Sequence, residues 1–195
     1  MEFNEIHETY RRRIHAYMER FVGEAEAEDL TQEVFTRVSQ SLKTFRGDSR
    51  LSTWIYRIAT NAALDRIRKK DRCGEELCID AAGEREDQDA WNGDVKRLEH
   101  QVIRREMNDC IRNVVSELPE MYRTIVELSE FEGFKDNEIA GILGLRLESV
   151  KIRLHRGRAK LKEELSKRCI LYRDERNEFA CDLKNEFRNG HPTIV

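Results

Sequence analysis

The chain has 195 residues, of which 37% are charged, and this length is compatible with two small folded domains. The sequence contains no long apolar run, and its N-terminus mixes acidic and basic residues without an apolar signal core. These features exclude a membrane-spanning helix and a secretory signal, so we expect no membrane insertion and a cytoplasmic location. The chain has only two prolines, which favours a mainly helical protein.

Although the net charge is only −3, charge is segregated along the chain. Residues 1–35 hold nine acidic and four basic residues, whereas residues 36–72 hold ten basic and three acidic residues. Residues 73–94 hold eight acidic residues and one arginine, and residues 144–168 hold nine basic and three acidic residues. Basic blocks attract phosphates locally whatever the total charge, so two separate nucleic-acid contact surfaces are predicted.

Three or four helices are predicted in the first part of the chain, because apolar residues recur there at helical spacing. The segments with this spacing are residues 3–21, 29–45 and 51–70. No strand is predicted anywhere in the chain.

Aromatic and basic residues alternate between residues 27 and 72, a pattern typical of single-strand binding. The aromatic positions are Phe45, Trp54 and Tyr56, and the basic ones are Arg46, Arg50, Arg57, Arg66, Arg68, Lys69 and Lys70. Trp54 lies on the apolar stripe of its helix and is expected to be chiefly a core residue. Tyr56 lies off that stripe, so Tyr56 and the turn from Phe45 to Leu51 are the better candidates for contact with a base.

An acidic linker is predicted over residues 73–97, which contain three glycines in their first part and show no sustained periodicity. Helices are expected next over residues 98–117 and, after Pro119, over residues 120–131. The tail, residues 167–195, has only a weak apolar series at multiples of four, interrupted at Glu175. It is expected to be a short amphipathic helix or disordered.

The segment from Asp136 to Glu164 predicts a helix-turn-helix. A first apolar stripe ends at Gly144, where a helix is expected to stop, and a second stripe continues in a strongly basic helix. The stripe residues are Ile139, Ile142, Leu143, Leu147, Val150, Leu154 and Leu161. A short helix, a glycine turn and a longer basic helix are the parts that place a helix in the DNA major groove. The alternative is an ordinary helical hairpin with a solvated charged face.

Catalytic chemistry is not indicated. The sequence has no phosphate-binding glycine loop, nucleophile elbow, HExxH motif or inward-facing acid–base pair, so neither an enzyme nor a cofactor is expected. The five cysteines lack CxxC spacing and are expected to be free thiols, with no metal bound. They are Cys73, Cys78, Cys110, Cys169 and Cys181.

Two further functions remain open from the residues alone. The first is a stand-alone regulator that binds DNA as a dimer through the helix-turn-helix, which leaves residues 27–72 unexplained. The second is a thiol- or metal-responsive interaction protein that sequesters a partner through its cysteine-bearing tail.

Three segments together resemble a bacterial RNA polymerase sigma factor of the sigma-70 family, in its extracytoplasmic-function (ECF) group. They are AEDLTQEVFTRV, FRGDSRLSTWIYRIATNAALDRIRKK and LPEMYRTIVELSEFEGFKDNEIAGILGLRLESVKIRLHRGRAKLKEEL, in the family's order. The resemblance implies an all-α fold with two small helical domains, residues 1–72 and 98–166, joined by a flexible acidic linker. Arg146 departs from the family, which commonly has a small capping residue such as serine there.

The resemblance also implies partners and sites. Residues 1–72 correspond to family region two, which binds core RNA polymerase and melts the minus-ten promoter element. Residues 98–166 correspond to region four, which reads the minus-thirty-five element, and the linker threads through the polymerase. The expected partners are core RNA polymerase, promoter DNA and an anti-sigma factor.

The site residues implied by the resemblance form three sets. The polymerase-binding set is Asp29, Gln32, Glu33 and Phe35. The minus-ten set is Phe45, Arg46, Gly47, Asp48, Ser49, Tyr56, Arg57, Asn61 and Arg66. The minus-thirty-five set is Arg146, Glu148, Ser149, Lys151, Arg153 and Arg156.

Overall fold

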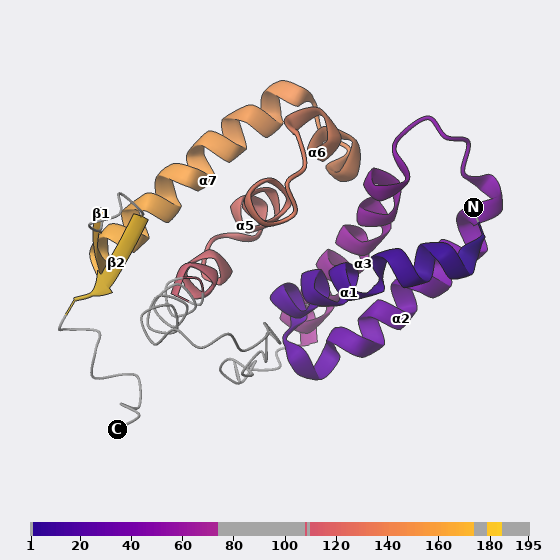
Figure 1. Cartoon of the computed structure of the whole chain (residues 1–195), viewed down its shortest axis with the longest axis horizontal. Coiled ribbons are helices and arrows are strands. Elements are labelled where there is room, and N and C mark those ends of the chain that lie inside the picture. Colours follow the sequence, from indigo (N-terminus) through magenta and orange to yellow (C-terminus); the bar gives the residue numbers. More distant parts are fainter. Residues whose placement is uncertain (1, 74–107, 109, 174–178, 185–195) are drawn as a thin grey trace, which may run out of the picture. The chain divides into compact units, whose positions relative to one another are not determined.

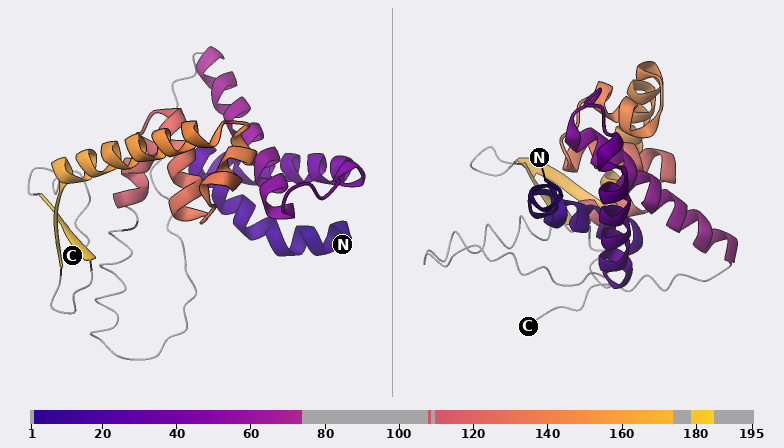
Figure 2. Two further views of the ribbon diagram at one scale, coloured as in Figure 1. Left: turned by 90° about the horizontal axis from the view of Figure 1, so that it is seen from above. Right: turned by 90° about the vertical axis from the view of Figure 1, so that its right-hand side faces the viewer.

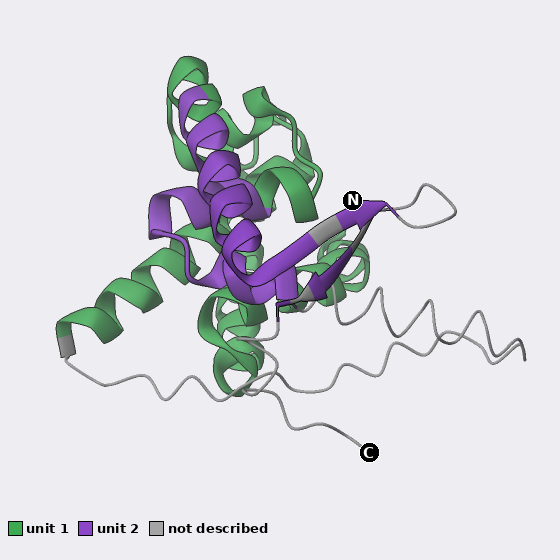
Figure 3. Ribbon diagram, turned by 90° about the vertical axis from the view of Figure 1, so that its left-hand side faces the viewer, with its two compact units in different colours: residues 1–86, 128–151 green, residues 87–127, 152–195 purple. Residues whose placement is uncertain are grey.

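The computed structural model describes residues 2–73, 108, 110–173 and 179–184. It divides into two compact units, coloured green and purple in Figure 3. Unit 1 comprises residues 1–86 and 128–151, and unit 2 comprises residues 87–127 and 152–195. Residues 74–97 of the predicted linker and most of the predicted helix 98–117 lie outside the described residues. The described part is mainly helical and contains one two-stranded sheet, which confirms the predicted all-α class.

The N-terminal part of unit 1 consists of three helices that pack side by side (Figure 1). They are α1 (Phe3–Val22), α2 (Glu24–Ser41) and α3 (Leu51–Cys73), with a 3-10 turn at Leu42–Thr44. Each helix contributes an apolar face to one core, whose largest buried side chains include Ile6, Ile14, Tyr17, Met18, Leu30, Ile55 and Tyr56. The predicted helices 3–21 and 51–70 are therefore confirmed.

Helix α2 begins earlier than the sequence pattern predicted. It starts at Glu24, five residues before the expected start at Asp29. Glu24 and Glu26 lie in its first turn, where the partial positive charge of a helix N-terminus favours carboxylates. Ala27 is buried and adds one further contact to the core.

The helix-turn-helix forms as predicted. Helix α6 (Asp136–Leu143) ends at Gly144, which adopts a left-handed conformation with φ 64° and ψ 32°. Glycine reaches this region without the steric cost of a Cβ atom, and the Leu145 N–H closes the turn by donating to the Ala140 carbonyl at 3.0 Å. Helix α7 (Leu147–Arg168) follows directly.

In unit 2, α5 (Glu120–Val126) packs against α7, and residues 110–116 form a further helical stretch. A Cβ atom at Gly157 of α7 would lie 3.0 Å from a Val126 methyl carbon. The missing side chain therefore lets the two helices approach closely. The predicted helix 120–131 is present, but its second half, Glu127–Phe131, is a π-helix.

The tail differs from its prediction. Residues Cys169–Arg173 (β1) and Phe179–Leu183 (β2) form an antiparallel pair of strands. The expectation of a short helix or disorder is therefore wrong for these residues, and so is the expectation of no strand anywhere; residues 174–178 and 185–195 lie outside the described part. Figure 2 shows α7 leading directly into β1. Apolar residues spaced by multiples of four are also spaced by multiples of two, so the same pattern fits a strand.

Among the helices that the structure describes, none has both the length and the apolar character needed to cross a membrane.

Candidate nucleic-acid interface

The turn between α2 and α3 presents small polar and charged residues to solvent. Gly47 at its centre has φ 78°, a conformation that glycine adopts readily, and residues 46–49 are all exposed. Phe45 is half-buried at one edge and lies against Trp54, with ring centroids 5.0 Å apart. Trp54 is also only half-buried, so the turn is bordered by a partly accessible aromatic pair.

Tyr56 lies in the core, although the sequence pattern predicted an accessible position. The expectation that it lies off the apolar stripe is wrong, because its side chain is fully buried. The Tyr56 hydroxyl donates to the Glu132 carboxylate. The Tyr56 ring packs edge-on against the Phe134 ring, with centroids 4.8 Å apart. Burial, and then the nearby Glu132 charge, raise the pKa of Tyr56 above its usual value. In this conformation the tyrosine is therefore a core residue.

Glu132 is the centre of a buried polar group that sequence reasoning missed. Its carboxylate also accepts hydrogen bonds from Arg20 and, at 3.4 Å, from Arg13 of α1. The Glu132 side chain is only 6% exposed and that of Arg20 only 12%. We call Arg13, Arg20, Tyr56 and Glu132 the Glu132 cluster. Its partners lie between 76 and 119 residues away from Glu132 in the chain, so no local pattern signals it.

Three predicted minus-ten residues on α3 differ in accessibility. Arg57 and Asn61 are exposed and lie one helical turn apart, so they share a face. Arg66 is half-buried and paired within unit 1, donating to Glu26 at 3.0 Å and to Glu33 at 3.4 Å. Arg57 and Asn61 therefore present an open polar face, whereas Arg66 stabilises the contact between α2 and α3.

The predicted polymerase-binding residues on α2 also separate into two groups. Asp29 and Gln32 are exposed, and Gln32 donates to Glu28 at 3.3 Å. Hydrogen bonds from Arg11 and then Gln32 hold the pKa of Glu28 below its usual value. Phe35 is only 4% exposed and packs edge-on against the His7 ring, so it supports the helix from the core side.

The basic helix α7 separates its apolar and polar faces clearly. Val150 and Leu154 are buried, as predicted. The predicted minus-thirty-five residues lie on other sides of α7, except Arg146, which directly precedes it. Arg146, Glu148, Lys151 and Arg156 are exposed, and Ser149 and Arg153 are half-buried. The helix therefore offers cations and hydrogen-bonding groups together, as contact with duplex DNA requires.

Ile152 is a candidate contact residue that sequence reasoning missed. Its side chain is 52% exposed, although it lies between Lys151 and Arg153 on the polar side of α7. The sequence does contain a sign of this exposure, because Ile152 falls outside the apolar stripe that includes Val150 and Leu154. Ile152 is spaced by four residues from both Glu148 and Arg156, so all three share one exposed face.

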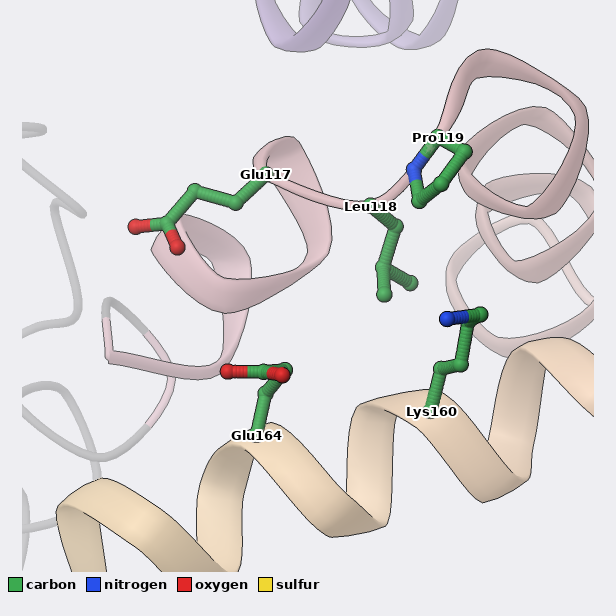
Figure 4. Close-up of a pocket in the computed structure, with 5 residues that line it drawn as sticks. All are labelled: Glu117, Leu118, Pro119, Lys160 and Glu164. Carbon is green, nitrogen blue, oxygen red and sulfur yellow. The ribbon is translucent and has the colours of Figure 1, made fainter.

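The far end of α7 is anchored within unit 2. Arg168 donates to the Glu117 carboxylate through both terminal nitrogens, one at 2.8 Å, and this pairing raises the pKa of Arg168. A hollow nearby is lined by Glu117, Leu118, Pro119, Lys160 and Glu164. Figure 4 shows Lys160 and Glu164 projecting from α7 towards the loop that carries the other three. Two carboxylates beside one lysine make this hollow unsuitable for phosphate.

Comparison with known proteins identifies the two sequence blocks. Residues 6–73 match the family model "Sigma-70 region 2", and residues 108–161 match "Sigma-70, region 4". The chain is 35% identical to the ECF RNA polymerase sigma factor SigW of Bacillus subtilis (strain 168), over 84% of this chain and 88% of that protein. It is 32% identical to the RNA polymerase sigma-H factor of Pseudomonas aeruginosa, over 80% of this chain and 82% of that protein.

Solved structures agree in fold. The sigma factor RpoE of Bartonella quintana, in complex with the anti-sigma factor NepR, is similar with a TM-score of 0.64 and 20% identity, covering 84% of this chain and 96% of that one. CnrH in complex with the cytosolic domain of CnrY is similar with a TM-score of 0.58 and 21% identity, and the match covers 85% of this chain and 88% of that one. Members of the matched family are transcription initiation factors rather than enzymes. The chain belongs to the sigma-70 family of RNA polymerase sigma factors, and within it to the ECF group.

Proposed function

We propose that this protein binds core RNA polymerase and directs it to specific promoters, where transcription then begins. The observation that carries the proposal is the presence of both family regions, in order, in one chain. A stand-alone DNA-binding regulator needs only the second region. The direct test is promoter-specific transcription by core polymerase supplemented with the purified protein.

The polymerase contact is assigned to the exposed side of α2. Asp29 and Gln32 project from a helix whose opposite side is fixed in the unit 1 core through Leu30 and Val34. An acidic surface on a rigid helix suits a protein partner better than DNA, since phosphates repel carboxylates. Glu33 and Phe35 hold this surface in place through Arg66 and the core.

Capture of a minus-ten base is assigned to the turn Phe45–Ser49. A flipped base costs a few kcal/mol to extrude, so a fitted pocket must offset that cost. The turn supplies backbone shaped by Gly47, exposed Arg46, Asp48 and Ser49, and the aromatic edge of Phe45. Arg57 and Asn61 on α3 would hold the displaced strand nearby. Tyr56 joins this surface only when the Glu132 cluster opens.

Duplex recognition is assigned to the exposed face of α7. Arginine pairs with the guanine edge and glutamate accepts from the cytosine amino group in the major groove, while an apolar side chain contacts the thymine methyl group. Arg156, Glu148 and Ile152 provide these three chemistries on one face. Lys151, Arg146, Ser149 and Arg153 flank that face and suit contact with phosphates or further bases.

The remaining parts follow from the same role. Residues 1–72 and 98–166 act as the two functional domains, and the acidic segment between them passes through the polymerase. An anti-sigma factor is the expected regulator, since two similar proteins were solved with partners, one of them named as an anti-sigma factor. The protein would act in the cytoplasm, where core polymerase works.

Base selection and polymerase binding should be separable by substitution. Grafting a different loop over residues 45–49 should change the preferred minus-ten base, by about 1–3 kcal/mol of discrimination, and leave core affinity nearly intact. Asp29→Ala should weaken core binding and leave base preference unchanged. Core affinity and open-complex formation on single-base promoter variants measure both effects.

The matched control is Glu8→Ala, which removes an exposed carboxylate from α1. It should alter neither property. An unchanged base preference after the loop graft would show that the pocket lies elsewhere.

A further inference from the structure

Three cysteines from separate segments meet in unit 2. Cys110 lies in the helical stretch 110–116, Cys169 opens β1, and Cys181 is the central residue of β2. The Cys110 and Cys169 sulfurs are 3.5 Å apart, although the residues are 59 positions apart in sequence. Cys181 lies close enough to influence the pKa of Cys169, and it adds the third sulfur to the group.

The hairpin register explains why Cys181 joins this group. Cys169 pairs with Leu183, and Cys181 pairs with Leu171. Cys181 is therefore the diagonal neighbour of Cys169, and diagonal positions lie on the same face of an antiparallel pair. The tail hairpin thus brings two thiols to one face, and the third comes from the helical stretch at residue 110.

The arrangement favours sulfur–sulfur chemistry over metal binding. All three cysteines are free thiols. Among the described residues, no group of three or more His, Cys, Asp or Glu side chains is arranged to hold a metal ion. A disulfide needs only two sulfurs that can rotate from van der Waals contact to a bond of about 2.05 Å.

We propose that Cys110 and Cys169 form a reversible redox site that a peroxide oxidises to a disulfide, which fastens the C-terminal hairpin to the helical stretch 110–116. This site is independent of promoter recognition, and it gives the tail a role that the sigma-family regions do not supply.

The oxidation balances in two steps. Cys110, which is the more accessible of the two, attacks the peroxide as its thiolate, and the O–O bond breaks to leave a sulfenic acid on Cys110 and hydroxide. The buried Cys169 sulfur then attacks the sulfenic sulfur, so that the S–S bond forms and water leaves. Two thiols lose two electrons and two protons in total, and one peroxide is reduced to two waters.

Burial sets the rate of this reaction. Desolvation, and then the contact with Cys169, raise the pKa of Cys110 to about 11, while the Arg168 charge opposes this shift. Burial likewise raises the pKa of Cys169 and of Cys181, and Asp182 adds to the shift at Cys181. Since the thiolate is the nucleophile, oxidation is slow at neutral pH and should accelerate about tenfold per pH unit below the pKa.

The disulfide would reinforce an end of α7 that is already anchored. Arg168, the last residue of α7, is paired with Glu117, and Cys169 follows it directly. A cross-link from Cys169 to Cys110 closes a long loop that contains α5, α6 and α7. Closing a long loop restricts the unfolded chain, so the oxidised form should unfold at a higher temperature than the reduced form.

The test uses the full-length protein and hydrogen peroxide. After oxidation, alkylation and proteolysis, mass spectrometry should find a disulfide-linked peptide pair containing Cys110 and Cys169, which dithiothreitol removes. Oxidation at pH 9 should be about a hundredfold faster than at pH 7. The oxidised protein should show a higher thermal midpoint, and Cys110→Ser and Cys169→Ser should each abolish both the linked pair and that increase.

A double variant, Cys73→Ser with Cys78→Ser, is the control and should retain the linked pair. Oxidation that links Cys169 only to Cys181, or that oxidises thiols without any Cys110–Cys169 link, would overturn the proposal. So would stoichiometric zinc binding that protects all three thiols from peroxide, since the group would then be a metal site.

Discussion

Replacing Glu132 by alanine should open the buried contact that covers Tyr56. The substitution leaves the Arg20 guanidinium and the Tyr56 hydroxyl without their shared partner, although both groups are largely shielded from water. Breaking a buried charge pair by removing one partner costs about 3 kcal/mol or more. Hydrogen exchange at the Phe134 amide, which bonds to the Leu128 carbonyl at 2.9 Å, should therefore accelerate by about 150-fold.

The matched control removes an exposed ion pair from the same unit. Arg50 is 75% exposed in its pair with Glu138, so Arg50→Ala should change exchange at Phe134 by less than about fivefold. Equal acceleration in both variants would show that burial of Glu132 does not stabilise this segment.

The same contact should depend on pH in a defined direction. The pKa of Tyr56 is raised in the folded protein, whereas an exposed tyrosine ionises near pH 10. The protonated phenol is the form that donates to Glu132. The contribution of Tyr56 is therefore complete below about pH 10 and is lost as the pH rises further. Exchange at Phe134 that is insensitive to alkaline pH, after correction for the intrinsic rate, would contradict this.

The second large effect is expected on the exposed face of α7. Arg156→Ala should weaken binding of the polymerase holoenzyme to duplex containing the minus-thirty-five element by about 1–3 kcal/mol and relax specificity at one base pair. Lys151→Ala should instead weaken binding to all sequences. It should also reduce the slope of log affinity against log salt concentration by about one unit, which corresponds to one lost phosphate contact. Affinities measured over a range of salt concentrations on single-base variants distinguish the two.

Lys167→Ala provides the control on the same helix. Lys167 is paired with Glu163 and Glu164 near the opposite end of α7, about 16 Å along the helix from Arg156. The Lys167→Ala variant should bind the same duplex with the affinity of the unsubstituted protein. If Lys151→Ala, Arg156→Ala and a further variant, Arg153→Ala, all leave DNA affinity unchanged, the recognition face lies elsewhere on the protein.

Local sequence patterns predicted most of the helices. The helices 3–21 and 51–70 followed from apolar periodicity, and the stop at Gly144 followed from the one residue type that adopts a left-handed turn without strain. The long motifs also carried the family assignment. For the helices and for the stop at Gly144, the signal lies within a few helical turns of sequence.

Features that depend on distant partners were not accessible in this way. Tyr56 lies three and seven residues before the buried Ala59 and Ala63, so its local spacing also fits the core face of the helix. Its partners Glu132 and Phe134, however, lie far along the chain. The meeting of Cys110 with Cys169 has the same origin. The tail hairpin was missed for another reason, since spacing by four fits both a helix and a strand, and only pairing between the two strands decides between them.

The most direct test of promoter-directed initiation by this protein is transcription in a purified system. Core RNA polymerase and this protein are combined with a promoter library randomised at the minus-ten and minus-thirty-five elements, and the transcripts are sequenced. We expect discrete start sites that require both components and share two sequence elements. Failure of the protein to bind core polymerase at micromolar concentration, or transcripts that do not depend on it, would rule out a sigma-factor role.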